Sequence, residues 1–172
     1  MQLLEDCILI AILNAAMVMD MLTGKIRNRL ILVGFILGLL CKLQIHGASG
    51  GLAFASGVFL PFVWTFPLFA FGAVGAGDVK LLAVIGGFLG RAAMPQCLFL
   101  TLIFGAVAAI LKMSFQGSLC RRMAYLANYV GQSIQNRRFA PYGQPLQEGQ
   151  AVIHMSAPIL LAVLACMIGG VV

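Results

Sequence analysis

The chain has 172 residues, of which 62% are hydrophobic and 9% are charged, and its formal net charge is +6. A water-soluble protein of this size and composition would expose a very large apolar surface, so soluble globular classes are excluded. We therefore expect an all-α, polytopic protein surrounded by membrane lipid, with one domain covering residues 1–172.

The apolar stretches are long enough to cross a hydrocarbon core of about 30 Å as helices. Glu5 and Asp6 precede the first stretch, whereas a secretory signal begins with a basic region, so we interpret this stretch as the first helix. The segment 50–90 is too long for a single crossing, and the glycines of 72–77 predict the turn within it. The sequence thus predicts six transmembrane helices, at 3–22, 30–45, 51–71, 78–90, 92–111 and 151–172.

A polar segment, 112–150, separates the last two predicted spans. Apolar residues recur in it at helical spacing: Leu119, Met123, Leu126, Val130 and Ile134. This pattern is compatible with an amphipathic helix on the membrane surface and equally with an ordinary cytosolic connector.

The basic residues are distributed unequally over the loops. Six crossings place one group on the same side: Lys25, Arg27, Arg29, Lys80, Lys112, Arg121, Arg122, Arg137 and Arg138. The opposite side has only Lys42 and Arg91. The positive-inside rule then makes the first side cytoplasmic and places both termini outside. The positive charge is therefore attributed to topology, and no nucleic-acid partner is expected.

Asp20 and Asp78 lie at the ends of apolar helices and, in this topology, at one depth. A carboxylate near hydrocarbon is costly unless it is neutralised or partnered, which makes it a functional candidate. Taken singly, each aspartate has an alternative interpretation: Asp20 as the partner of Lys25, and Asp78 as a helix N-cap. Taken together, after Gly75 and Gly77, which allow close backbone approach, the two aspartates favour a functional site.

Two neighbouring carboxylates share one proton, so the ionised member can take a proton from water while the protonated member polarises a carbonyl. Because a helix N-terminus favours an anion and a C-terminus does not, we expect Asp20 to hold the proton at rest. The cysteines, Cys7, Cys41, Cys97, Cys120 and Cys166, are scattered singly and form no C-x-x-C pair. We expect no metal and no cofactor.

The stretch "GAGDVKLLAVIGGFLG" resembles the signature of the prepilin peptidases, which are membrane aspartic proteases of the GxGD type. Its matching residues are Gly75, Gly77, Asp78, Lys80 and Leu81. The segment "DMLTGKIRNRL" is similar to the family's first motif, D followed by five residues and I-P-N, through Asp20, Ile26 and Asn28. Arg27 stands where that motif usually has proline.

The resemblance implies a peptidase that removes the leader of a prepilin or pseudopilin on the cytoplasmic side of the bacterial inner membrane. It implies catalytic roles for Asp20 and Asp78 and supporting roles for Gly75, Gly77, Lys80 and Asn28. The cytosolic C-x-x-C segment of larger members is missing between the first two helices, so we expect no methyltransferase activity. The chain resembles the small members that serve Flp pili or minimal type IV and secretion systems, whose assembly machinery would be a partner.

Other interpretations stay open at this point. A small transporter or channel subunit could use intramembrane aspartates to relay protons or bind cations. A structural assembly subunit with a degenerate site would account for Arg27. A presenilin-like protease is disfavoured because Met19 replaces the tyrosine of that family's first motif and no P-A-L sequence occurs. His154 and Ser156, near the start of the sixth span, could line the site, and Lys80 could tune Asp78 or simply extend to water.

Overall fold

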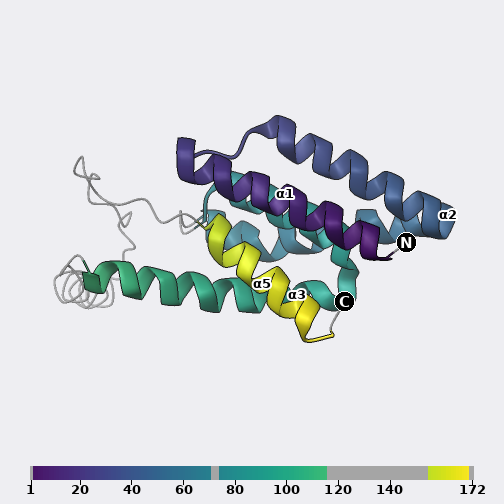
Figure 1. Cartoon of the computed structure of the whole chain (residues 1–172). Coiled ribbons are helices and arrows are strands. Elements are labelled where there is room, and N and C mark those ends of the chain that lie inside the picture. Colours follow the sequence, from purple (N-terminus) through teal and green to yellow (C-terminus); the bar gives the residue numbers. More distant parts are fainter. Residues whose placement is uncertain (1, 71–73, 116–154, 171–172) are drawn as a thin grey trace. The chain divides into compact units, whose positions relative to one another are not determined.

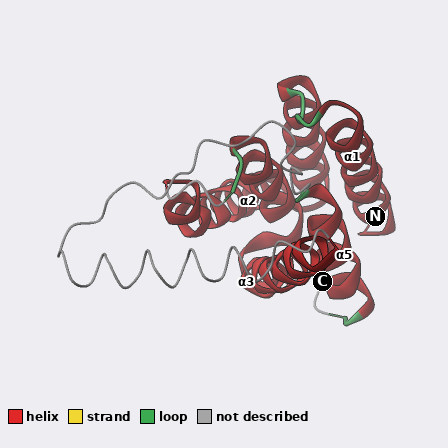
Figure 2. Cartoon of the chain, turned by 90° about the vertical axis from the view of Figure 1, so that its left-hand side faces the viewer, coloured by secondary structure: helices red, strands yellow, loops and turns green. Residues whose placement is uncertain are grey.

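The computed structural model describes residues 2–70, 74–115 and 155–170. All regular structure within these ranges is helical, which confirms the predicted all-α class (Figure 2). The helices are α1 (Gln2–Thr23), α2 (Asn28–Ala70), α3 (Ala76–Phe115) and α5 (Ser156–Ile168) (Figure 1). The predicted amphipathic helix at 119–134, most of the segment 112–150 and His154 lie outside the described residues.

Two of these helices contain a break at a glycine with positive φ. Gly47 in α2 has φ 60° and ψ −145°, and Gly90 in α3 has φ 76° and ψ 179°. Side chains other than glycine rarely adopt this conformation. At the first break the chain folds back closely, since a Cβ on Gly50 would overlap the carbonyl oxygen of Lys42. The breaks fall where the sequence predicts the boundaries between spans two and three and between spans four and five.

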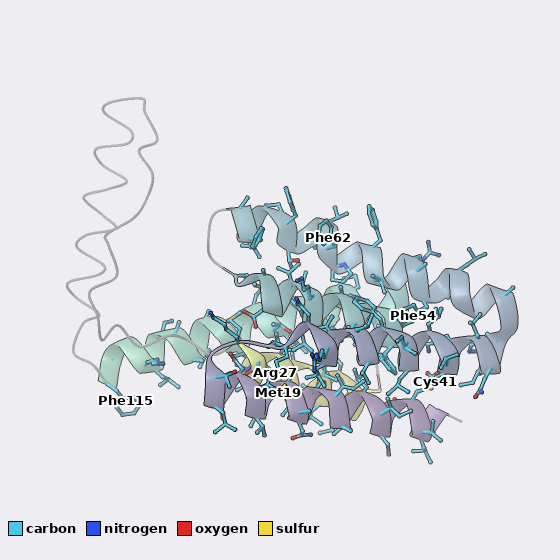
Figure 3. All side chains as sticks on the ribbon, turned by 90° about the horizontal axis from the view of Figure 1, so that it is seen from above. Met19, Arg27, Cys41, Phe54, Phe62 and Phe115 are labelled. Atoms are coloured by element: carbon cyan, nitrogen blue, oxygen red, sulfur yellow. The ribbon has the colours of Figure 1, made fainter. Side chains whose placement is uncertain are left out.

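Three described helices are long and apolar enough to cross a membrane: α1, α2 and α3 as far as Lys112. The fourth, α5, is apolar but has only 13 residues. The separation into six membrane crossings therefore stays a prediction. Large apolar side chains are exposed along these helices, among them Leu22 at 79%, Phe59 at 66% and Trp64 at 58%. Such a surface suits lipid, and Figure 3 shows Phe62 pointing away from the bundle.

Contacts divide the chain into two compact units, 1–105 with 154–172, and 106–153. The single domain expected over 1–172 stays a prediction. The larger unit has one apolar core built mainly from α1, α3 and α5, with Ile31 of α2. Its largest fully buried side chains include Leu9, Leu13, Leu81, Ile85, Ile159 and Val163.

The first half of α3 lies at the centre of this unit. All residues from Leu81 to Phe88 are buried, as expected for a helix that is apolar on every face. The second half of α2 approaches it so closely that a Cβ on either Gly57 or Gly86 would overlap the other residue's carbonyl oxygen. Small residues at helix interfaces permit such backbone contact in membrane proteins.

The buried face of α1 carries a carboxylate near each end. Glu5, Leu9, Leu13, Ala16 and Asp20 recur at helical spacing and are all buried. Glu5 is paired through Oε2 with the Nζ of Lys42 on α2, at 2.8 Å. This contact confirms that Glu5 and Lys42 lie at the same end of the unit, as the predicted topology requires. Asp20 lies toward the opposite end of the helix.

Candidate functional site

Asp20 belongs to the last turn of α1. Its carboxylate continues the buried stripe of Leu13 and Ala16, and the residue is only 7% exposed. The helix ends at Thr23, because the backbone N–H of Gly24 donates to the carbonyl oxygen of Asp20 at 2.8 Å and Gly24 has φ 64°. A glycine in this left-handed conformation is a common helix C-terminus. The sequence thus holds Asp20 in regular helix, immediately before a tight turn.

Asp78 belongs to the first turn of α3. Its N–H and that of Val79 donate to the carbonyl oxygen of Gly75, at 3.1 and 3.2 Å. The helix therefore begins at Ala76, two residues earlier than predicted, and the N-cap position falls on Gly75 instead of Asp78. A carboxylate in the first turn is stabilised by the helix dipole, so this position still favours an anion.

Two contacts join the segments that carry the two motifs. A Cβ on Gly77 would lie 3.5 Å from the Cβ of Ile26, so the start of α3 lies against the loop between α1 and α2. The Nζ of Lys80 donates to the Oδ1 of Asn28 at 3.1 Å. Residues predicted as supporting, Lys80 and Asn28, are thus in direct contact, while their roles stay predictions.

A third segment reaches the same place. Ser156, the first residue of α5, donates a hydrogen bond from Oγ to the Oδ2 of Asp20 at 2.6 Å. Ser156 is 1% exposed, so this bond is buried. The sequence names Ser156 only as a possible lining residue, and the structure gives it a direct partner. The available signal was its place at the start of the last apolar stretch.

The loop after α1 also borders an open depression of about 440 Å³, lined by Arg27, Asn28 and Arg29. Two guanidinium groups make this surface positive. The described ranges contain no cluster of three or more histidine, cysteine or acidic side chains that could hold a metal ion. The chemistry offered by the described residues at this end is that of carboxylates, a hydroxyl, an amide and basic groups.

Comparison with known proteins assigns the chain to a family. The sequence model of the type IV leader peptidase family matches residues 7–110, more than half of the chain. The match includes Asp20 and Asp78 and ends before α5. No curated protein and no solved structure matches the chain.

Proposed function

The chain belongs to the type IV leader peptidase family, and we propose that it is a membrane aspartic endopeptidase that removes the leader of prepilins or pseudopilins. Membership of this family, together with the long apolar helices, makes it an integral membrane peptidase. The observation that carries the finer proposal is the convergence of both motif segments, through Lys80 with Asn28 and Gly77 with Ile26.

Asp20 and Asp78 are the proposed catalytic residues. The ionised carboxylate takes a proton from water, and the water oxygen attacks the carbonyl carbon of the scissile peptide bond. The protonated carboxyl donates its proton to the carbonyl oxygen, which gives a neutral tetrahedral intermediate. When the C–N bond breaks, the departing amine takes a proton from the first carboxyl and the second recovers its own from the intermediate. The dyad then returns to its starting charge, and no metal or cofactor takes part.

The proposed substrate is an apolar helix preceded by a polar leader. Such a helix can lie in lipid against the exposed apolar side chains of the enzyme and present its end beside Asp20 and Asp78. The basic residues Arg27, Arg29 and Lys80 at this end support a site that faces the cytoplasm of a bacterial inner membrane, with both termini outside. The short connection from Thr23 to Asn28 supports a peptidase without methyltransferase activity, serving a Flp-type or minimal secretion system.

The test is cleavage of a co-expressed prepilin from the same genome, followed in membranes by its change in size. Asp20→Asn and Asp78→Asn remove a charge at nearly constant shape, so each should abolish cleavage while protein level holds. Asp6→Asn is the matched control, because Asp6 is a carboxylate near the other end of α1, and it should cut like wild type. If both Asp20→Asn and Asp78→Asn still cut, the protease proposal fails and proton or cation relay becomes the leading function.

A further inference from the structure

The hydrogen bond between Ser156 and Asp20 lies beyond what the family match covers. The match ends at residue 110, whereas Ser156 begins α5 and is separated from Asp20 by 136 residues. At 2.6 Å the distance between Oγ and Oδ2 lies within the range for a hydroxyl that donates to a charged oxygen. Both residues are more than nine-tenths buried.

The direction in which Ser156 faces is set by its own helix. Ser156, Ile159, Leu160 and Val163 follow helical spacing and are all buried, so the hydroxyl belongs to the apolar face of α5. Serine at a helix start often bonds to the helix's own amides. The N-cap position of α5 is Met155, which makes no side-chain cap, and the Ser156 hydroxyl is directed to α1 instead.

We propose that Ser156 is a positioning residue that holds the Asp20 carboxylate in the orientation that the catalytic dyad needs. This rests on the proposed function.

The expected size of the effect follows from the kind of bond. A hydrogen bond donated to a charged group changes an equilibrium by about ten- to a hundredfold. Loss of the Ser156 hydroxyl should therefore have a measurable effect on a reaction that depends on the orientation of Asp20.

Charged groups on the neighbouring segments act on the same dyad. They are Lys25 and Arg27 in the loop after α1, Arg29 at the start of α2, and Asp78 and Lys80 on α3; the described part of α5 carries none. All of these stay in place when Ser156 alone is changed. The difference between wild type and a Ser156 variant thus isolates the hydroxyl.

The experiment compares Ser156→Ala and Ser156→Cys, which lose a strong donor, with Ser156→Thr, which keeps a hydroxyl. Steady-state kcat and KM are measured for cleavage of a purified prepilin in detergent. We expect kcat to fall about ten- to a hundredfold in the Ala and Cys variants, with KM unchanged, because the carboxylate is no longer held. Ser156→Thr should restore kcat.

Two controls separate this inference from the proposed function. Ser56→Ala removes a hydroxyl that bonds within its own helix, to the carbonyl oxygen of Ala53, and should leave kcat and KM unchanged. Asp20→Asn tests the dyad itself. If Asp20→Asn is inactive but Ser156→Ala keeps the wild-type kcat, the positioning role is overturned and the protease stands. If Ser156→Ala loses activity and Ser156→Cys restores it, or Ser156→Thr does not, the hydroxyl is not what holds Asp20 and the inference is equally overturned.

Discussion

The Nζ of Lys80 lies 3.1 Å from the Oδ1 of Asn28, and this contact links the two motif segments across 52 residues of sequence. Both side chains are exposed, so the bond competes with water. Its contribution is expected to be at most about 1 kcal/mol. The pair therefore aligns the two segments without determining whether the chain folds.

We expect Lys80→Met and Asn28→Ala each to lower kcat/KM for prepilin cleavage about two- to fivefold, the change that corresponds to this energy. The double variant should be no slower than either single variant, because both remove the same bond. A double-mutant cycle on kcat/KM measures whether the losses of the two single variants add. Full additivity of the two losses would show that the contact is unimportant in the active enzyme.

Replacing each of the two glycines before Asp78 with alanine should slow cleavage to different degrees. A Cβ on Gly75 would lie 3.1 Å from the Oδ2 of Asp78, so the carboxylate must move by a few tenths of an ångström. A Cβ on Gly77 would lie nearest to Ile26, at an ordinary 3.5 Å. Gly75→Ala is expected to slow cleavage about tenfold and Gly77→Ala about twofold at most, since catalysis is sensitive to small displacements.

Rates from the two variants, normalised to folded protein, check this prediction, and Gly77→Ala is the matched control. An equal loss in both would mean that the motif requires glycine for a reason other than the space around Asp78.

Glu5 and Lys42 form an ion pair, and removing the lysine should destabilise the fold more than removing the glutamate. Its side chains are only 9% and 17% exposed, and the Oε1 of Glu5 is buried without a hydrogen-bond partner. Lys42→Met leaves that carboxylate without its cation, which should cost about 3 kcal/mol of unfolding free energy. Glu5→Gln should cost less, because the long lysine side chain can turn outward to water.

Thermal unfolding in detergent measures both losses, and the double variant Glu5→Leu with Lys42→Met should recover most of the stability. Glu5→Gln being the more harmful single change would contradict this account.

The backbone contact between α2 and α3 predicts a strong effect of a single methyl group. Gly86→Ala would drive a Cβ into the backbone of Gly57, and we expect a loss of about 1–3 kcal/mol. Gly51→Ala is the control, because its Cβ would meet only the flexible end of Leu43, at 3.0 Å. That change should stay within about 0.5 kcal/mol. The unfolding midpoints of the two variants in the same detergent test this prediction. A Gly86→Ala variant as stable as wild type would contradict the close approach of α2 and α3.

Much of the helical plan follows from the lengths of the apolar runs and from the glycines between them. The exact residues at which the helices begin and end do not follow from these features. The sequence suggests that α3 begins at Asp78, whereas it begins at Ala76 because the carbonyl oxygen of Gly75 accepts the first hydrogen bonds. A cap made by the glycine backbone leaves no side-chain signal. Likewise, one residue such as Gly47 can reverse a helix, so the number of crossings is hard to read from length alone.

The candidate site was accessible from the sequence in part. Asp20 and Asp78 could be found because carboxylates are rare in apolar segments. The motifs around them then indicated the resemblance to a family. The bond from Ser156 could not be foreseen. Helical spacing places Ser156 on the same face as Ile159 and Val163, but it does not tell how far α5 is shifted along α1. That register comes from side-chain packing between segments distant in the chain.

The distance in sequence between Ser156 and Asp20 has a consequence for biosynthesis. Asp20 leaves the ribosome early, in the first helix, whereas its hydroxyl donor is translated 136 residues later. A nascent chain that stops before Ser156 carries the carboxylate without this donor. Completion of the hydrogen bond therefore coincides with the arrival of α5, so that the Asp20 carboxylate obtains this donor only after α1, α2 and α3 have been synthesised.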